Sequence, residues 1–206
     1  AKLREIYTRL EFRGLLKALE GEGGAAGESA SAGAAPNADP MPPAQPLSRD
    51  YEAITTPEAL QRWMTLIDRA ALTAFDTETT SLDYRVARIV GMSFCVEAGK
   101  AAYLPLAHRY AGAPDQLDLE RTLALLKPWL ESSRHAKLGH HLKYDAHVLR
   151  NHGIRLGGAS HDSMLESFVL DSVATRHDMD SVAKHYLGID TIKYEDVAGK
   201  GAKQIG

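Results

Sequence analysis

The chain has 206 residues, enough for one domain with a substantial core plus appended segments, but too few for a large multidomain enzyme. Its 24 lysines and arginines against 27 aspartates and glutamates give a formal net charge of −3, so composition excludes a globally basic binder of nucleic acid or anionic membranes, and a polyanion would have to be held locally. A single cysteine, Cys95, excludes an internal disulfide framework, and without an 18-residue apolar run or a signal-peptide pattern we expect a soluble, cytoplasmic protein.

The first 50 residues divide into two segments of different composition. Residues 2–19 carry apolar side chains at helical spacing with charged residues between them, which predicts an amphipathic helix. Residues 20–50 are rich in Gly, Ala, Ser and Pro and contain almost no large apolar residue, so they cannot bury enough surface to offset their chain entropy. We therefore predict that residues 1–19 end a preceding domain and that residues 20–50 form a flexible, disordered linker.

The main domain is predicted to cover residues 51–206 and to begin with a helix followed by strands. Thr56 as the cap and Pro57 in the first turn mark the start of this helix. The strand-like runs are residues 70–77, 88–97 and 100–106, and the turn at 97–100 predicts an antiparallel meander.

Helical signals dominate the rest of the chain. A helix is expected after Asp118, with Pro128 kinking or shortening its end. A short strand is predicted at 135–138 and a helix over about 141–151, closed by Gly153. Two more helices are predicted, one over 163–171 capped by Asp162, and one stopped at Gly188 and capped by Asp178 or Asp180.

Two carboxylates, Asp76 and Glu78, stand where the apolar run 70–75 turns polar. Side chains alternate along a strand, so these two acids point to one face while Thr77 points to the other. Charges this close raise one another's pKa unless a cation lies between them, and oxygen ligands suit Mg²⁺ or Mn²⁺. Two solvated acids at a strand end are the alternative interpretation. A third acid would favour the metal site, and Asp145, one turn after His141 on the predicted helix, is the candidate.

Several segments resemble the 3′→5′ proofreading domain of bacterial DNA polymerase I, one of the DEDD exonucleases. They are Phe75-Asp76-Thr77-Glu78-Thr79, Leu142-Lys143-Tyr144-Asp145, Ala101-Ala102-Tyr103-Leu104-Pro105-Leu106-Ala107-His108, Leu125-Leu126-Lys127-Pro128, Asp162-Ser163-Met164-Leu165-Glu166-Ser167, Arg176-His177-Asp178-Met179-Asp180-Ser181 and Ala198-Gly199-Lys200-Gly201. The resemblance runs from about Tyr51 to Gly206, and residues 2–19 resemble the end of the 5′-nuclease domain of the same enzymes. On this resemblance the chain is an interior piece of a longer polymerase.

The resemblance implies a ribonuclease-H-like α/β fold, in which a mixed sheet with an antiparallel meander and a further strand is flanked by helices. It also implies two divalent ions, Mg²⁺ or Mn²⁺, with Asp76 binding both, Glu78 one and Asp145 the other. These acids would be the catalytic residues of a 3′→5′ DNA exonuclease that releases deoxynucleoside monophosphates during replication and repair.

By matched position, the resemblance also implies DNA contacts. Leu82 would wedge against the terminal bases, Tyr194 would stack under one and Arg176 would reach the backbone. His141 stands where the family usually has an amide; it could share a metal with Asp145, four residues later, but we favour a hydrogen-bonding role near the DNA. The structural alternatives for the first three are a loop staple, an ordinary surface aromatic and a pair with a neighbouring acid. The implied partners are a single-stranded or frayed 3′ end and the other polymerase domains of the same chain; we expect a monomer, associated with the bacterial nucleoid and not with a membrane.

The family's last motif, Tyr-x-x-x-Asp on a helix after the Gly-Lys-Gly segment, is not found in the chain. Tyr186 and Asp190 have the right spacing, but they precede Gly199-Lys200-Gly201, and Gly188 should end the helix between them. We therefore expect residues 1–206 alone to be weak or inactive. The alternatives are a non-catalytic DNA-binding or scaffold domain of the same polymerase and a processing ribonuclease of the same superfamily.

Overall fold

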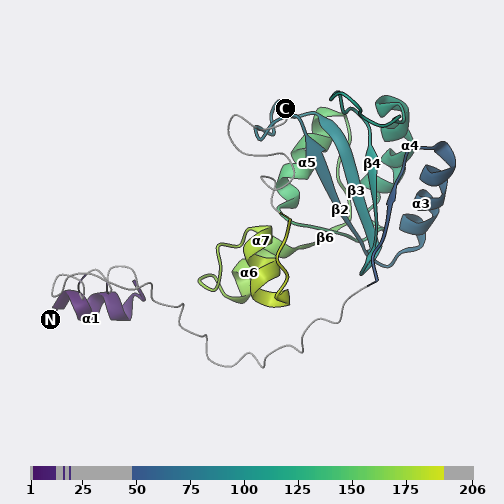
Figure 1. The fold of residues 1–206 in the computed structure, drawn as a ribbon. Helices are drawn as coiled ribbons and strands as arrows, with labels where there is room; N and C mark the ends of the chain where they lie inside the picture. Colours follow the sequence, from purple (N-terminus) through teal and green to yellow (C-terminus); the bar gives the residue numbers. More distant parts are fainter. Residues whose placement is uncertain (1, 13–15, 17–18, 20–47, 193–206) are drawn as a thin grey trace. The chain divides into compact units, whose positions relative to one another are not determined.

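The computed structural model describes residues 2–12, 16, 19 and 48–192, which divide between two units, Ala1–Ala38 and Asp39–Gly206. In the first unit, helix α1 covers Lys2–Arg9 (Figure 1). The single helix predicted for residues 2–19 is wrong, because the backbone turns at Glu11 (φ 54°) and the Phe12 amide donates to the Tyr7 carbonyl. The rings of Tyr7 and Phe12 pack at this turn, with centroids 6.2 Å apart. The predicted linker at 20–50 lies almost wholly outside the described residues.

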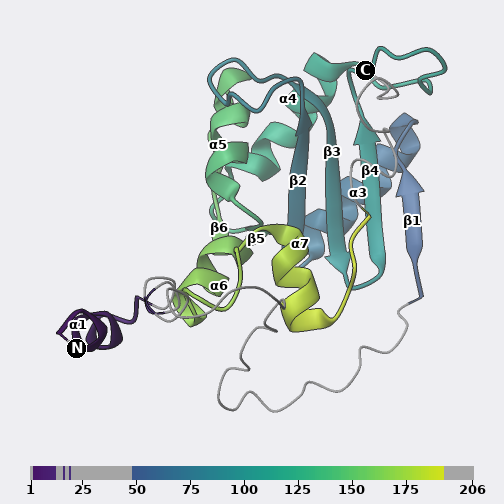
Figure 2. The same ribbon diagram turned by 60° about the vertical axis from the view of Figure 1, so that its left-hand side comes forward.

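The second unit is built on a six-stranded mixed sheet in the order β1-β4-β3-β2-β5-β6 (Figures 1 and 2). The predicted meander is confirmed: β2 (Thr73–Thr79), β3 (Ile89–Glu97) and β4 (Lys100–Pro105) pair antiparallel in that order. The short strand β5 (Lys137–Gly139) runs parallel to β2. This places the strand that carries Asp76 and Glu78 in the middle of the sheet.

Two edge strands were not predicted from the sequence. They are β1 (Asp50–Ala53), which pairs parallel with β4, and β6 (Ala159–Asp162), which pairs parallel with β5. Both are four residues long and mostly exposed, so they lack the apolar alternation that marks a half-buried strand. The sheet therefore begins at Asp50, one residue inside the predicted linker.

The helices begin largely where their caps predict. They are α3 (Pro57–Arg69), α4 (Leu119–Glu131), α5 (Leu142–Asn151), α6 (Ser163–Leu170) and α7 (Met179–Val182), the last continued by a π-helical turn over Ala183–Leu187. The side chains of Thr56, Asp118, Asp162 and Asp178 accept bonds from backbone amides in the first turns of α3, α4, α6 and α7. As predicted, Gly188 ends the last of these segments in the left-handed conformation.

Of the two effects predicted for Pro128, a kink or a shortened end, the structure excludes the shortening of α4. The helix continues to Glu131, three residues beyond it. Trp129 and Leu130 are buried in the core immediately after the proline, so packing holds the last turn in place despite the lost backbone hydrogen bond. The indole N–H of Trp129 also donates to the Ile67 carbonyl at 3.1 Å, which joins α4 to α3.

The core lies between one face of the sheet and helices α3, α4 and α5. Phe75 of β2 and Phe94 of β3 both meet the Trp129 ring of α4 edge-on, with ring centroids 6.4 and 6.0 Å apart. Leu142 and Val148 of α5 belong to the same cluster. Since Phe75 points into this core, the alternating positions 74, 76 and 78 point to the opposite face.

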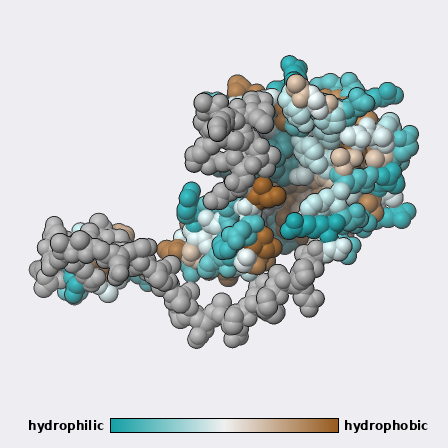
Figure 3. All heavy atoms as spheres, in the orientation of Figure 1, coloured by the Kyte–Doolittle hydropathy of each residue, from teal (hydrophilic) through white to brown (hydrophobic). Residues whose placement is uncertain are grey.

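Helices α6 and α7 lie together at one end of the sheet (Figure 2). Hydrophobic residues gather on the surface of this region (Figure 3), and those of α6 are Leu165, Phe168, Val169 and Leu170. Among the described residues, we find no helix with the length and apolarity that a bilayer crossing requires.

Candidate active site

Asp76 and Glu78 project from one face of β2, as their spacing predicts. Across the β2–β3 pair, Asp76 is opposite Ser93 and Glu78 is opposite Gly91. Asp76 is partly buried, whereas Glu78 is exposed. The two carboxylates therefore lie on the face of the sheet that α3 and α4 do not cover. Asp76 is partly shielded from solvent there, and Glu78 extends into it.

Asp145 reaches the same strand from helix α5. Strand β5 pairs with β2 only at Thr73 and Ala74, so the edge of β2 beyond them is open to α5. There the Asp145 carboxylate accepts bonds from the Thr77 backbone N–H (3.1 Å) and from its hydroxyl (2.6 Å). Asp145 is only 2% exposed. A residue 68 positions later is thus fixed beside the strand that carries the two other acids.

Two of the three acids, Asp76 and Asp145, have raised pKa values. Burial, followed by the negative charges of Asp145 and Glu78, raises the pKa of Asp76 to about 7, and its backbone bond with Thr77 opposes the rise. Burial also raises the pKa of Asp145, which the two Thr77 bonds and the nearby His141 counteract. Negative charge is therefore concentrated here with too little positive charge to balance it.

This donor set fits a hard divalent cation. Carboxylate oxygens are the ligands that Mg²⁺ and Mn²⁺ prefer, and a cation would relieve the repulsion that raises the pKa of Asp76. In residues 2–12 and 48–192, however, no three His, Cys, Asp or Glu side chains are gathered closely enough to form a ready-made metal cluster. One Asp145 oxygen is already engaged by Thr77.

The start of α5 is held by an aspartate from another strand. Asp162 at the end of β6 accepts bonds from the backbone amides of His141 (3.0 Å) and Leu142 (2.9 Å). The same carboxylate accepts bonds from Met164 and Leu165 at the start of α6, so one side chain caps two helices. The sequence indicated only the α6 cap. Asp162 thereby helps to set the position of Asp145, one turn into α5.

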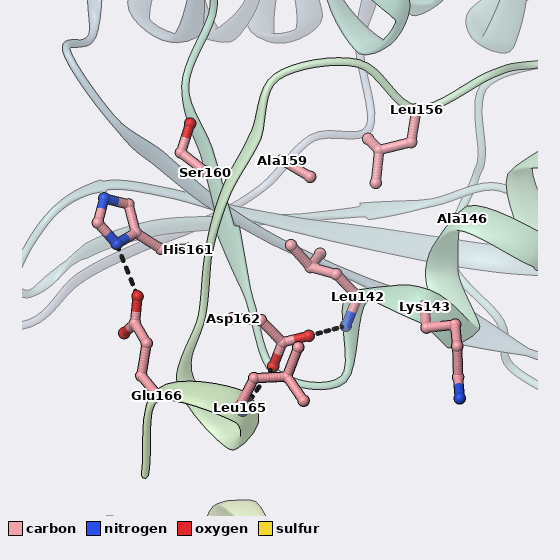
Figure 4. Close-up of a pocket in the computed structure, with 10 residues that line it drawn as sticks. All are labelled: Leu142, Lys143, Ala146, Leu156, Ala159, Ser160, His161, Asp162, Leu165 and Glu166. Carbon is pink, nitrogen blue, oxygen red and sulfur yellow. Dashed lines mark hydrogen bonds and ion pairs between the residues drawn. The ribbon is translucent and has the colours of Figure 1, made fainter. Parts of the chain in front are cut away.

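Figure 4 shows the pocket that Asp162 lines between α5, β6 and α6. Its volume is about 500 Å³, and His161 Nδ1 and Glu166 Oε1, from two residues that line it, are 2.7 Å apart. None of the three predicted metal ligands lines it. We therefore assign the candidate site to the exposed face of β2 and not to this pocket.

Tyr144 of α5 shapes the loop after β2. Its hydroxyl donates to the Ser81 carbonyl at 2.5 Å and bonds to the Thr79 hydroxyl at 2.5 Å. Leu82 follows directly and is 94% exposed. In the sequence, Tyr144 stands out only as a member of a motif, because hydrogen bonding between positions 63 residues apart leaves no local signal.

The other predicted DNA-binding residues lie in different surroundings. His141 adopts a left-handed backbone (φ 68°) at the start of α5, and its side chain makes no capping bond. The Arg176 side chain is 88% exposed and pairs with Asp178 at 3.3 Å. Tyr194 lies outside the described residues. Asp190 is exposed and pairs with Lys184 at 2.7 Å, in keeping with the exclusion of the Tyr186–Asp190 motif.

A family model described as 3′-5′ exonuclease matches residues 51–205. The DNA polymerase I of Pseudomonas aeruginosa is 53% identical over 158 residues, which are 76% of this chain and 17% of that protein. The DNA polymerase I of Rhizobium leguminosarum is 35% identical over 172 residues, or 75% of this chain and 17% of that protein. This chain therefore spans about a sixth of the length of these curated relatives.

Several solved structures have a similar fold. The catalytic core of RRP6 from Trypanosoma brucei has a TM-score of 0.57 at 14% identity and covers 76% of this chain and 40% of its own. Escherichia coli RNase D has a TM-score of 0.54 at 19% identity, with coverage of 72% and 36%. NrnC of Brucella melitensis, solved with bound Mg²⁺, has a TM-score of 0.50 at 15% identity, with coverage of 76% and 70%. At these identities the likeness concerns the fold alone, and it confirms the predicted ribonuclease-H-like α/β fold.

Proposed function

Because the chain belongs to the 3′-5′ exonuclease family, we propose that it is the 3′→5′ exonuclease domain of a bacterial DNA polymerase I. Its substrate would be a single-stranded or frayed 3′ end of DNA, from which it releases deoxynucleoside monophosphates. The observation that carries the proposal is the position of Asp145. This acid comes from a distant helix to the edge of β2, next to the two acids that the strand itself supplies.

In the proposed site, Asp76, Glu78 and Asp145 hold two divalent ions, Mg²⁺ or Mn²⁺. When bound, such ions supply an activated water and stabilise the charge of the scissile phosphate and of the departing oxygen. Asp76 retains its proton to about pH 7 without an ion, so ion binding would displace that proton. Thr77 orients Asp145 through two bonds, one of them with the strand backbone itself.

We propose that four residues contact the DNA, namely Leu82, His141, Arg176 and Tyr194. Leu82 is an exposed apolar side chain on the loop that leaves β2, where it could pack against an unpaired base of any sequence. His141 begins the helix that carries Asp145, and its charge would lower the pKa of that acid. The exposed Arg176 guanidinium, which pairs with Asp178 in the structure, would exchange this partner for a DNA phosphate.

The wider setting follows from the relatives. Since this chain matches only 17% of the length of these bacterial DNA polymerases, we propose that it works within such a longer polymerase. Its role would then be in DNA replication and repair, in a monomer of the bacterial cytoplasm close to the nucleoid. The preceding residues 1–19 and the linker 20–50 would join it to a 5′-nuclease domain.

The decisive experiment measures mononucleotide release from 3′-ended single-stranded DNA in Mg²⁺, with the protein at its natural length. Asp76→Asn should lower kcat by a factor of 1,000 or more, about 4 kcal/mol of transition-state stabilisation. A matched control is Asp50→Asn, an exposed aspartate on β1 at the far edge of the sheet, which should leave kcat unchanged. Circular dichroism would show that both variants fold.

Equal rates for Asp76→Asn and the unmodified protein would refute the metal site. Retained DNA binding without any hydrolysis would favour the non-catalytic scaffold domain. Release from RNA ends at rates well above those from DNA ends would favour a processing ribonuclease.

A further inference from the structure

Tyr103 lies on the same face of the sheet as the acids. In the register of the meander, Asp76 of β2 is opposite Ser93 of β3, and Ser93 is opposite Tyr103 of β4. Residues directly opposite one another in antiparallel strands point to the same side. Asp76, Ser93 and Tyr103 therefore form one row across three strands, and Tyr103 is a partly buried aromatic at the end of it.

The Tyr103 side chain leans across to the neighbouring row, which contains Glu78. That row consists of Glu78, Gly91 and Pro105. A Cβ atom added at Gly91 would overlap the Tyr103 hydroxyl, so this hydroxyl occupies the space that a side chain at position 91 would fill. Opposite residues have Cβ atoms about 4.5–5.5 Å apart, so the hydroxyl lies within reach of the Glu78 side chain.

A hydrogen bond with His108 fixes the position of the Tyr103 hydroxyl. His108 Nε2 and Tyr103 Oη are 2.5 Å apart. His108 is fixed in turn, because its backbone N–H donates to the Gln116 side chain at 2.7 Å and its carbonyl accepts from the same amide at 2.9 Å. The edge of the Tyr110 ring packs against the His108 ring, with centroids 5.6 Å apart.

Tyr103 is a neutral hydrogen-bond donor in this setting. Burial, followed by the charge of Glu78 and the influence of Tyr110, raises the pKa of Tyr103 to about 12. The phenol therefore keeps its proton at neutral pH and can donate it in a hydrogen bond. Glu78 itself is exposed, and within residues 48–192 no side chain is hydrogen-bonded to its carboxylate.

We propose that Tyr103 is a positioning residue of the exonuclease site, whose hydroxyl, braced by His108, holds the Glu78 carboxylate in its working orientation. This inference rests on the proposed function and adds a residue to it. In the proposed arrangement, His108 Nε2–H donates to Tyr103 Oη, and the phenolic O–H donates to Glu78. A long exposed side chain would otherwise sample several rotamers, and the fixed hydroxyl removes that freedom. Gly91 leaves room for this arrangement, since a Cβ atom at position 91 would displace the hydroxyl.

The test compares variants of the natural-length protein in two assays, steady-state DNA hydrolysis and Mn²⁺ binding by calorimetry. Tyr103→Phe removes only the hydroxyl and should lower kcat about tenfold with KM unchanged, and weaken Mn²⁺ binding several-fold, as expected for a residue that orients a ligand. His108→Ala should behave alike, whereas His108→Gln, whose amide can still donate to Tyr103, should recover most of the activity. The matched control is Tyr51→Phe on β1, which is 66% exposed and remote from the acids.

The outcomes separate the two proposals. If the unmodified protein hydrolyses DNA and binds Mn²⁺, but Tyr103→Phe matches it in both assays, the role of Tyr103 is refuted and the exonuclease stands. A raised KM with an unchanged kcat would make Tyr103 a DNA contact and would also refute positioning. If the variants lose activity in proportion to a lower unfolding temperature, and His108→Gln does not recover it, then Tyr103 and His108 only stabilise the fold and the positioning role is refuted. If the unmodified protein neither hydrolyses DNA nor binds Mn²⁺, both proposals fail.

Discussion

The carboxylate of Asp145 and both the backbone and the hydroxyl of Thr77 form a closed, buried hydrogen-bonded pair across 68 residues of sequence. Thr77 stands between Asp76 and Glu78 on the strand, yet its side chain faces the opposite side. The alternation that directs Asp76 and Glu78 to one face of the sheet therefore directs the intervening residue toward α5. The tripeptide Asp76-Thr77-Glu78 thus supplies two of the acids and, through Thr77, holds the third acid, Asp145.

Replacing Thr77 by valine should weaken this anchor. The substitution keeps the shape of the side chain but removes the hydroxyl bond of 2.6 Å, which leaves a buried carboxylate oxygen with one partner fewer. We expect the free energy of unfolding to fall by about 1–3 kcal/mol and the exonuclease rate to fall with it. Urea denaturation and the DNA assay would measure the two effects. Thr77→Ser keeps the hydroxyl and is the control; a serine variant as damaged as the valine variant would contradict the explanation.

The raised pKa of Asp76 predicts a pH-dependent penalty in the absence of metal. Its pKa is about 7 in the folded state against 3.8 ordinarily, so between these values the folded protein holds a proton that the unfolded chain has released. The folded state binds more protons there, and the free energy of unfolding therefore falls as pH rises through this window. The penalty is absent below about pH 3.8 and complete above about pH 7.

Asp76→Asn should remove this penalty. With a chelator present, the variant should become progressively more stable than the unmodified protein between pH 4 and pH 8, by an amount of order 1–3 kcal/mol. Urea unfolding at several pH values is the measurement, with Asp50→Asn as the exposed control. Added Mg²⁺ should stabilise the unmodified protein more than the asparagine variant. If the free energy of unfolding changed with pH in the same way for the two proteins, the pKa of Asp76 would not be raised in the folded state.

Leu82 offers a test of DNA binding that is separate from folding. Because its side chain is 94% exposed, Leu82→Ser should change the free energy of unfolding by no more than about 0.5 kcal/mol. If Leu82 packs against terminal bases, the KM for single-stranded DNA should rise about 3- to 10-fold. Val86 is 64% exposed in the same loop, and Val86→Ser is the matched control. Equal effects of the two serine variants on KM would mean that position 82 has no special contact.

The sequence predicted the parts of this fold that rest on local chemistry. The acids of β2, the helix starts at Thr56 and Asp118 and the antiparallel meander all follow from strand alternation, capping and turn signals within a few residues. The edge strands β1 and β6 could not be found in this way. Their extended conformation depends on hydrogen bonds to β4 and β5, which are distant in the sequence, and not on a local pattern.

The remaining features depend on contacts between distant segments. Asp162 carries an evident cap signal for α6, but its second role at α5 appears only once β6 lies beside β5. Tyr103 belonged to a segment that resembled the exonuclease family, yet nothing in that segment indicates which residue its hydroxyl would face. That information lies in the register of three strands and in the missing side chain of Gly91.

The packing of Tyr103 over Gly91 can be tested by stability alone. Gly91→Ala places a methyl group where the Tyr103 hydroxyl lies, and His108 hinders the ring from moving away. We expect the free energy of unfolding to fall by about 1–3 kcal/mol, the usual cost of overpacking. In a protein that already carries Tyr103→Ala, the methyl group has room. Adding Gly91→Ala should then lower the free energy of unfolding very little. Urea denaturation of the four proteins gives this coupling energy. Additive costs in the double variant would show that the two residues do not meet, and would also remove the geometric basis for assigning Tyr103 to Glu78.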